Sequence, residues 1–230
     1  MLAAQAVAQE KMGGGIMFTP IEHATMVIKI AETLIYVDPV GDAGAFAEFP
    51  PPDIILITHI HQDHFDPALI ASLKKDDTDI IGPRNVIDKL KHGKALNNGE
   101  SMTVKGVAIE AVPAYNLTKE RMEFHPRGRD NGYVLTWNDK WNGKRIYISG
   151  DTEDTKEMRS LKRIDYAIVC VNLPYTMSVE QAASAVLEMK PKVVIPYHYR
   201  SADGLSDLGK FKRLVSENKA IEVRLLKWYR

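Results

Sequence analysis

The order of short β-branched runs and helical patterns is the feature that most constrains the fold of this chain. Residues 25–30 and 33–37 predict a hairpin, and residues 54–58 form a continuous apolar run. Such a run is typical of a strand that is covered on both faces. Strand and helix patterns then alternate to the end of the chain. A sandwich of two β-sheets with helices on the outer faces accounts for this order, so we predict the α/β class.

Individual elements follow from the same patterns. Asp66 and Pro67 supply an N-cap and a first-turn proline for a helix over 67–75. Further helices are expected over 83–91, 153–161, 178–189 and 207–217. Further strands are expected over 79–82, 104–113, 133–137, 144–149, 165–171, 192–196 and 221–226. Residues 114–131 have no clear period and predict a long loop, which in a compact domain is usually functional.

The amino-terminal segment differs in composition from the rest of the chain. We interpret residues 1–15 as a flexible leader and residues 16–230 as a single domain. The leader contains a small-x-small pattern at Ala6, Val7 and Ala8, yet it lacks a basic start and a full apolar core. It is either a shortened export signal or a plain alanine-rich leader. The chain is accordingly expected to be cytoplasmic in the second case and exported or periplasmic in the first.

The composition of the chain limits the kinds of partner that it could bind. Lys+Arg and Asp+Glu both number 30, and the basic residues are scattered, so nothing favours nucleic-acid binding. No apolar stretch reaches the roughly 18 residues that a membrane helix needs. The only cysteine, Cys170, lies in an apolar run and is read as a buried thiol. Any metal must therefore be held by histidines and carboxylates, the expected partner is a small molecule, and the oligomeric state stays open.

A cluster of metal-ligand residue types follows the apolar run at 54–58. The sequence HIHQDH places His59, His61, Asp63 and His64 within six positions, although the whole chain has seven histidines. His59 and His61 alternate on an extended segment and so point to one side. Imidazole and carboxylate suit zinc and its first-row neighbours. A polar turn that happens to hold three histidines is the alternative.

The pattern H-x-H-x-D-H after an apolar strand resembles the signature of the metallo-β-lactamase superfamily. The segments TLIYVDP, RIYISGDT and KVVIPYHY resemble further motifs of that superfamily, in the same order. The G-D-T motif, YTM at 175–177 and the I-P-x-H-Y ending look most similar to the branch of ascorbate-6-phosphate lactonase and related metal-dependent hydrolases. The resemblance implies a metallo-β-lactamase-type αββα sandwich, in which two mixed β-sheets pack together between helices.

The same resemblance implies a two-metal site. One ion would be held by His59, His61 and His125, and the other by Asp63, His64 and His198, with Asp151 between them. Relatives often carry a histidine soon after the central strand, where this chain has Ala114, Tyr115 and Asn116. His125 is the only histidine of the following loop, so it is expected to complete the first site, with Asn116 as a neighbouring or weak ligand.

Other residues are candidates for contacts around the metals. Asp38 is either a partner that receives an N–H from a ligating histidine or an ordinary turn residue before proline. His23 occupies a position where relatives of the branch place a histidine. Tyr175 is a candidate to line the pocket, and Arg127, with Arg129, is the best candidate to meet an anionic substrate. Tyrosines at strand ends and loop arginines more often have plain packing or solvated roles.

The resemblance implies an enzyme that uses a hydroxide bound between two divalent ions to cleave an ester, lactone or phosphodiester of a small molecule. Asp63 and Asp151 are the expected catalytic carboxylates. Zn²⁺ is the expected ion, and Mn²⁺ or Fe²⁺ suits the same ligands. The alternatives are a non-catalytic metal-binding or sensory module and a β-lactam hydrolase. A complete ligand set favours an enzyme over a degenerate module, and the absence of a basic face argues against a nuclease.

Overall fold

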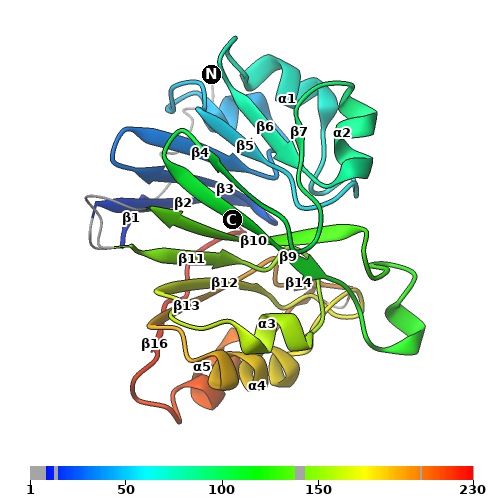
Figure 1. Ribbon diagram of the computed structural model, residues 1–230. Helices are drawn as coiled ribbons and strands as arrows, with labels where there is room; N and C mark the ends of the chain where they lie inside the picture. Colours follow the sequence, from blue (N-terminus) through cyan, green and yellow to red (C-terminus); the bar gives the residue numbers. More distant parts are fainter. Residues whose placement is uncertain (1–8, 13–14, 138–142, 203, 230) are drawn as a thin grey trace. The chain divides into compact units, whose positions relative to one another are not determined.

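The computed structural model describes residues 9–12, 15–137, 143–202 and 204–229 (Figure 1). The chain divides into two compact units, one of residues 1–95 with 227–230 and one of residues 96–226. Each unit is built on one seven-stranded mixed β-sheet. The predicted α/β class with two mixed sheets is thereby confirmed. The prediction of a single domain over 16–230 stays a prediction.

In the first unit the sheet has the order β1-β2-β3-β4-β5-β6-β7. Its strands are β1 (Glu10–Lys11), β2 (Ile16–Glu22), β3 (Thr25–Ile30), β4 (Thr33–Val37), β5 (Ile54–Leu56), β6 (Asp79–Gly82) and β7 (Lys94–Ala95). The pairs from β1 to β4 are antiparallel, and those from β4 to β7 are parallel. The parallel half brings the carboxyl ends of β4 and β5 to one edge, where Asp38 and the histidine motif begin.

Two helices and one 3-10 turn, η1 (Ala43–Phe46), accompany this sheet; α1 (Pro67–Leu73) and α2 (Arg84–Leu90) lie beside the parallel strands (Figure 1). The side chain of Asp66 accepts hydrogen bonds from two backbone N–H groups of α1, as the sequence predicts. Ile55 and Ile57 pack with Leu69 and Ile70 of α1 in a buried apolar cluster. This packing fixes the segment that leads into His59.

In the second unit the sheet has the order β16-β13-β12-β11-β10-β9-β8. Its strands are β8 (Ser101–Val104), β9 (Val107–Ala114), β10 (Asp130–Trp137), β11 (Arg145–Ile148), β12 (Tyr166–Cys170), β13 (Val193–Tyr197) and β16 (Glu222–Val223). β8 to β11 pair antiparallel, whereas β11, β12, β13 and β16 pair parallel. The carboxyl ends of β11, β12 and β13 therefore share one edge.

The helices of this unit, α3 (Lys156–Ser160), α4 (Val179–Met189) and α5 (Leu208–Val215), lie together beside the sheet (Figure 1). A capping box between Ser178 and Gln181 begins α4. A 3-10 turn, η2 (Lys119–Arg121), interrupts the long loop, and a short hairpin joins β14 (Arg200–Ser201) to β15 (Gly204–Leu205). No helix in the described part of the chain has the length and apolar character that crossing a bilayer requires.

The structure corrects several predicted elements. The single strand predicted over 104–113 is a hairpin, because Lys105 and Gly106 both take positive φ and reverse the chain between β8 and β9. Residues 16–22 form β2, which the sequence does not predict because Pro20 interrupts the pattern of the segment. Glu10–Lys11 pair with β2 inside the expected leader. Residues 1–8 and 13–14 lie outside the described residues, so the interpretation as an export signal stays a prediction.

Candidate metal centre

In the first unit, two parallel strands place the motif. β4 ends at Val37, and Asp38 follows with a φ of 45° that turns the chain sharply. The Asp38 side chain is fully buried and accepts hydrogen bonds from the Thr58 N–H at 2.7 Å and the Thr58 hydroxyl at 2.6 Å. Thr58 immediately precedes His59 on the segment that leaves β5. A buried carboxylate thus holds the start of the histidine motif in place.

The nitrogens of His59 and His61 face each other. His59 Nε2 lies 3.1 Å from His61 Nδ1, and the ring of His59 lies 4.0 Å from the ring of His64, centre to centre. Two imidazole nitrogens that bind one zinc ion at about 2.0–2.1 Å in tetrahedral geometry are roughly 3.3 Å apart. The spacing of these two nitrogens therefore fits ligation of a shared ion.

His64 is held by the same carboxylate that holds Thr58. Its Nδ1 lies 2.8 Å from Asp38 Oδ2, and its Nε2 lies 3.9 Å from Asp63 Oδ2. A proton on Nδ1 directs the Nε2 lone pair toward the Asp63 side. The Asp63 side chain is 46% exposed, whereas His64 is buried. The contact between His64 and Asp38 is the one expected of Asp38 under the first of its two alternatives, a partner that receives an N–H from a histidine of the motif.

Burial raises the pKa of Asp38, and this effect is opposed by its hydrogen bond to His64, by the charge of that ring and by the two bonds from Thr58. These bonds favour the ionised carboxylate over the neutral acid. Burial outweighs these bonds, so the pKa of Asp38 lies above its ordinary value.

In the second unit, candidate residues follow the shared edge of the parallel strands. Asp151, Asn172 and His198 come after the carboxyl ends of β11, β12 and β13, and each is almost fully buried. His198 takes a φ of 45°, as Asp38 does after β4. His198 Nε2 lies 3.6 Å from Asp151 Oδ2. Asn172 Nδ2 lies 3.4 Å from His198 Nε2, so this amide contacts the ring of the histidine.

His125 reaches the same carboxylate from the long loop. Its Nε2 lies 3.6 Å from Asp151 Oδ2, and its Nδ1 lies 3.1 Å from Asp130 Oδ2. Arg129 donates to both Asp130 oxygens, at 2.7 Å and 2.8 Å. Asp130 is fully buried and contacts both the His125 ring and the Arg129 guanidinium, so its side chain fixes the orientation of the ring. Both units thus orient a candidate ligand through a buried aspartate.

Replacing Asp130 by asparagine is expected to weaken zinc binding about 10- to 100-fold, because the ring of His125 loses its carboxylate partner. The measurement is competition with a zinc chelator of known affinity. Asp165→Asn serves as a matched control, since Asp165 is also a buried carboxylate paired with cations in this unit. Equal zinc affinities in Asp130→Asn and the unmodified protein would contradict this role of Asp130.

A second buried carboxylate fixes the loop itself. Glu153 is fully buried and accepts hydrogen bonds from Leu117 N, Thr118 N and Thr118 Oγ1 at 2.6–2.7 Å, and from Arg121 at 2.6 Å. Burial alone would raise the pKa of Glu153, but these bonds and the charge of Arg121 outweigh it and hold the pKa below its ordinary value. The loop that carries His125 is therefore tied to the chain just after Asp151.

Asn116 also belongs to this loop. Its Nδ2 donates to the backbone oxygens of Arg121 and Tyr175, at 2.9 Å and 2.7 Å, and its backbone N–H donates to the oxygen of His125. The amide thus links three segments around His125. These contacts describe a structural tie and leave the ligand role of Asn116 a prediction.

The remaining candidates lie as follows. His23 sits at the turn between β2 and β3, where its ring contacts Tyr229 edge-on at 5.2 Å. Tyr175 is 40% exposed and contacts Phe124 at 5.2 Å. Arg127 extends over the ring of Tyr115 at 5.2 Å, and its side chain is 65% exposed. Cys170 is buried, and burial raises the pKa of its thiol to about 12, so it is an inert thiol as predicted.

The sequence does not identify four residues that surround the candidate ligands in the two units: Thr58, Asp130, Glu153 and Asn172. Asn172 could have been found, because it follows a buried strand of a parallel sheet, at the edge where sites of such sheets form. Asp130 and Glu153 carry no signal of their own. Their roles depend on loop backbone groups that no spacing in the sequence specifies.

Comparisons with known proteins identify the family and the fold of this chain. The family described as the Beta-lactamase superfamily domain matches residues 17–198. Solved structures with low identity share the fold, among them a metallo hydrolase from Ignicoccus hospitalis with 22% identity and a TM-score of 0.77, covering 94% of this chain and 96% of that one. The predicted metallo-β-lactamase fold is therefore confirmed. The chain belongs to the β-lactamase superfamily.

Relatives with higher sequence identity identify the class of enzyme. A UPF0173 metal-dependent hydrolase of Nanoarchaeum equitans is 30% identical over 89% of this chain and 93% of its own length. A protein assigned as a metal-dependent hydrolase from Parabacteroides distasonis is 42% identical, with a TM-score of 0.85 over 99% of this chain and all of that one. The prediction of a metal-dependent hydrolase is confirmed at this level, and the described histidines and aspartates include groups able to bind a metal ion.

Proposed function

We propose that this chain is a hydrolase of small-molecule esters, lactones or phosphodiesters that uses two divalent ions. The observation that carries the proposal is the pair of facing nitrogens of His59 and His61, 3.1 Å apart, next to a His64 whose Nδ1 is held by buried Asp38. Both features orient lone pairs toward an ion before any ion binds.

We assign His59, His61 and His125 to one ion and Asp63, His64 and His198 to the other, with Asp151 shared. Support for the shared role comes from Asp151 Oδ2, which lies 3.6 Å from both His125 Nε2 and His198 Nε2. Bound divalent ions, with Zn²⁺ the first candidate and Mn²⁺ or Fe²⁺ suited to the same ligands, would supply water activation and polarisation of the bond to be cleaved.

The residues of the chain have separate tasks. Asp63 combines a 46% exposed side chain with a neighbouring ligand, so it can orient a water molecule and accept its proton at a carboxylate oxygen. Asp38 and Asp130 keep the Nδ1 atoms of His64 and His125 protonated. The solvent exposure of Asp63 favours an enzyme over a non-catalytic metal module, because a structural metal site is closed to solvent.

Among the three arginines of the loop, two are already engaged. Arg121 pairs with Glu153 and Arg129 with Asp130, both buried carboxylates. Arg127 remains 65% exposed, with Glu157 at 3.4 Å as a weak partner. Arg127 is therefore our candidate to meet an anionic group of the substrate.

The test is a panel of an aryl ester, a lactone, an aryl phosphodiester and a β-lactam, assayed with protein purified without chelator. We expect turnover of at least one of the first three, its loss after chelation, and its recovery with Zn²⁺, Mn²⁺ or Fe²⁺. His61→Ala should abolish this turnover. His92→Ala, which changes a histidine at the end of α2 bonded to the Leu90 oxygen, should leave it intact. Turnover that survives complete metal removal, or hydrolysis of the β-lactam alone, would contradict the proposal.

A further inference from the structure

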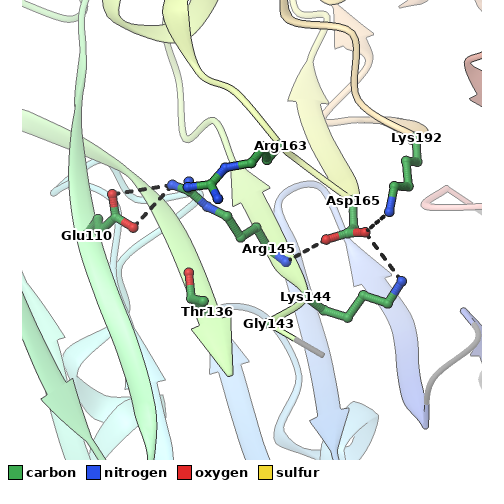
Figure 2. Close-up of a pocket in the computed structure, with 8 residues that line it drawn as sticks. All are labelled: Glu110, Thr136, Gly143, Lys144, Arg145, Arg163, Asp165 and Lys192. Atoms are coloured by element: carbon green, nitrogen blue, oxygen red, sulfur yellow. Dashed lines mark hydrogen bonds and ion pairs between the residues drawn. The ribbon is translucent and has the colours of Figure 1, made fainter. Parts of the chain in front are cut away.

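A pocket lies in the second unit, at the edge of the sheet where the parallel strands begin (Figure 2). Arg145 begins β11, Asp165 precedes β12, and Lys192 precedes β13. These strands are parallel, so their amino ends share the edge away from Asp151 and His198. Because a strand rises about 3.3 Å per residue, the two edges are on the order of 15 Å apart. The pocket has a volume of about 780 Å³ and is separate from the candidate metal centre.

Cationic groups outnumber anionic ones in this pocket. Lys144, Arg145, Arg163 and Lys192 line it together with only Glu110 and Asp165. Asp165 is fully occupied: one oxygen accepts from Lys192 at 2.8 Å and Lys144 at 3.3 Å, and the other accepts from the Arg145 N–H at 2.9 Å. The acidic groups therefore leave a net positive charge within the pocket.

Two guanidinium groups, those of Arg145 and Arg163, line this positively charged pocket (Figure 2). Arg145 directs Nη2 to Glu110 at 3.2 Å, while its buried Nε has no hydrogen-bond acceptor among the residues that the structure describes. Arg163 is exposed, its backbone takes a φ of 56°, and it makes no ion pair with any described residue. Neighbouring like charges repel each other unless an anion lies between them.

The hydroxyl of Thr136 adds a neutral donor to this wall of the pocket. Thr136 lies on β10 directly opposite Arg145 on β11. Guanidinium and hydroxyl donors that converge in this way suit the several acceptor oxygens of a phosphate group, which arginine binds through two parallel N–H bonds.

We propose that this pocket binds a phosphate group, either inorganic phosphate or the phosphate of a small monoester, with Arg163 as the principal ligand and Arg145 and Thr136 beside it. Glu110 competes with the phosphate for Arg145. Binding here does not depend on the proposed hydrolytic function, because the two sites occupy opposite edges of the sheet.

The experiment is calorimetric titration of the chelated protein with inorganic phosphate and, separately, with phenyl phosphate. Chelation removes phosphate binding to the metal centre. We expect a dissociation constant on the order of 1 mM, weakened about tenfold in Arg163→Gln, because a charged hydrogen-bond donor is lost. Glu110→Gln should tighten binding about threefold, since it frees Arg145 and removes a negative charge. Arg84→Gln, at an exposed arginine that begins α2, is the control and should change nothing.

The titrations with inorganic phosphate and with phenyl phosphate distinguish the two possible sources of the phosphate group. Equal affinity for the two ligands identifies inorganic phosphate as sufficient, and tighter binding of phenyl phosphate identifies a monoester as the ligand. Absence of binding at tens of millimolar phosphate overturns the proposal. Binding that is the same in the unmodified protein, Arg163→Gln and Glu110→Gln also overturns it, because the phosphate would then lie elsewhere.

Discussion

Replacing Asp151 by alanine is expected to lower hydrolytic turnover by about a thousandfold or more and to reduce the bound metal below two equivalents. The Asp151 carboxylate lies 3.6 Å from the Nε2 atoms of both His125 and His198. Its removal leaves two buried histidines without the anion that offsets the charge of a nearby ion. The measurement is turnover of the best substrate of the panel, together with metal content by elemental analysis.

Asp88→Ala is the control for this variant, because Asp88 is an exposed aspartate of α2. It should keep full turnover and full metal content. Circular dichroism should show the same secondary structure in both variants, since Asp151 lies outside the helices and strands. Turnover within about tenfold of the unmodified protein in Asp151→Ala would exclude the proposed shared role.

Replacing Asp38 by asparagine should have the second largest effect, and it should act on both stability and metal binding. Asp38 accepts from the Thr58 N–H, the Thr58 hydroxyl and His64 Nδ1 within 2.6–2.8 Å. Asparagine offers one acceptor oxygen, and its NH₂ group faces a donor whichever way it turns. We expect the free energy of unfolding to fall by about 2–3 kcal/mol and zinc affinity to fall about 10- to 100-fold.

Chemical unfolding of the chelated protein separates the two effects, because it measures stability without metal. Asp53→Asn provides the matched control: Asp53 accepts from the Leu34 N–H and from Lys75 in the same unit, and it precedes β5, whereas the histidine motif follows that strand. It should lower stability and leave zinc affinity unchanged. If Asp38→Asn binds zinc as tightly as Asp53→Asn does, the orienting role assigned to Asp38 is wrong.

The sequence predicts the parts of the fold that depend on local pattern. The hairpin of β3 and β4, the buried strand β5 and the Asp66 cap of α1 all follow from alternation, apolar runs and capping chemistry. The hairpin of β8 and β9 was not predictable, because the positive φ of Lys105 has no sequence signature comparable to Asn-Gly.

The contacts of the candidate site also differ in how far the sequence could predict them. His59, His61 and His64 are close in sequence, so one extended segment suffices to bring their rings together. The contact of Asp38 with His64 spans 26 residues and depends on the parallel pairing of β4 with β5. Asp130 and Glu153 bind loop groups whose positions depend on tertiary structure, so neither role could be read from the sequence.

The central claim is a centre for two divalent ions, and the most direct test is elemental analysis of protein purified without chelator, measured for the unmodified chain and for Asp151→Ala. We expect two equivalents of divalent metal per chain in the unmodified protein and fewer in the variant. A single equivalent that persists unchanged in Asp151→Ala, or an unmodified protein that binds no metal when Zn²⁺, Mn²⁺ and Fe²⁺ are supplied, would contradict it.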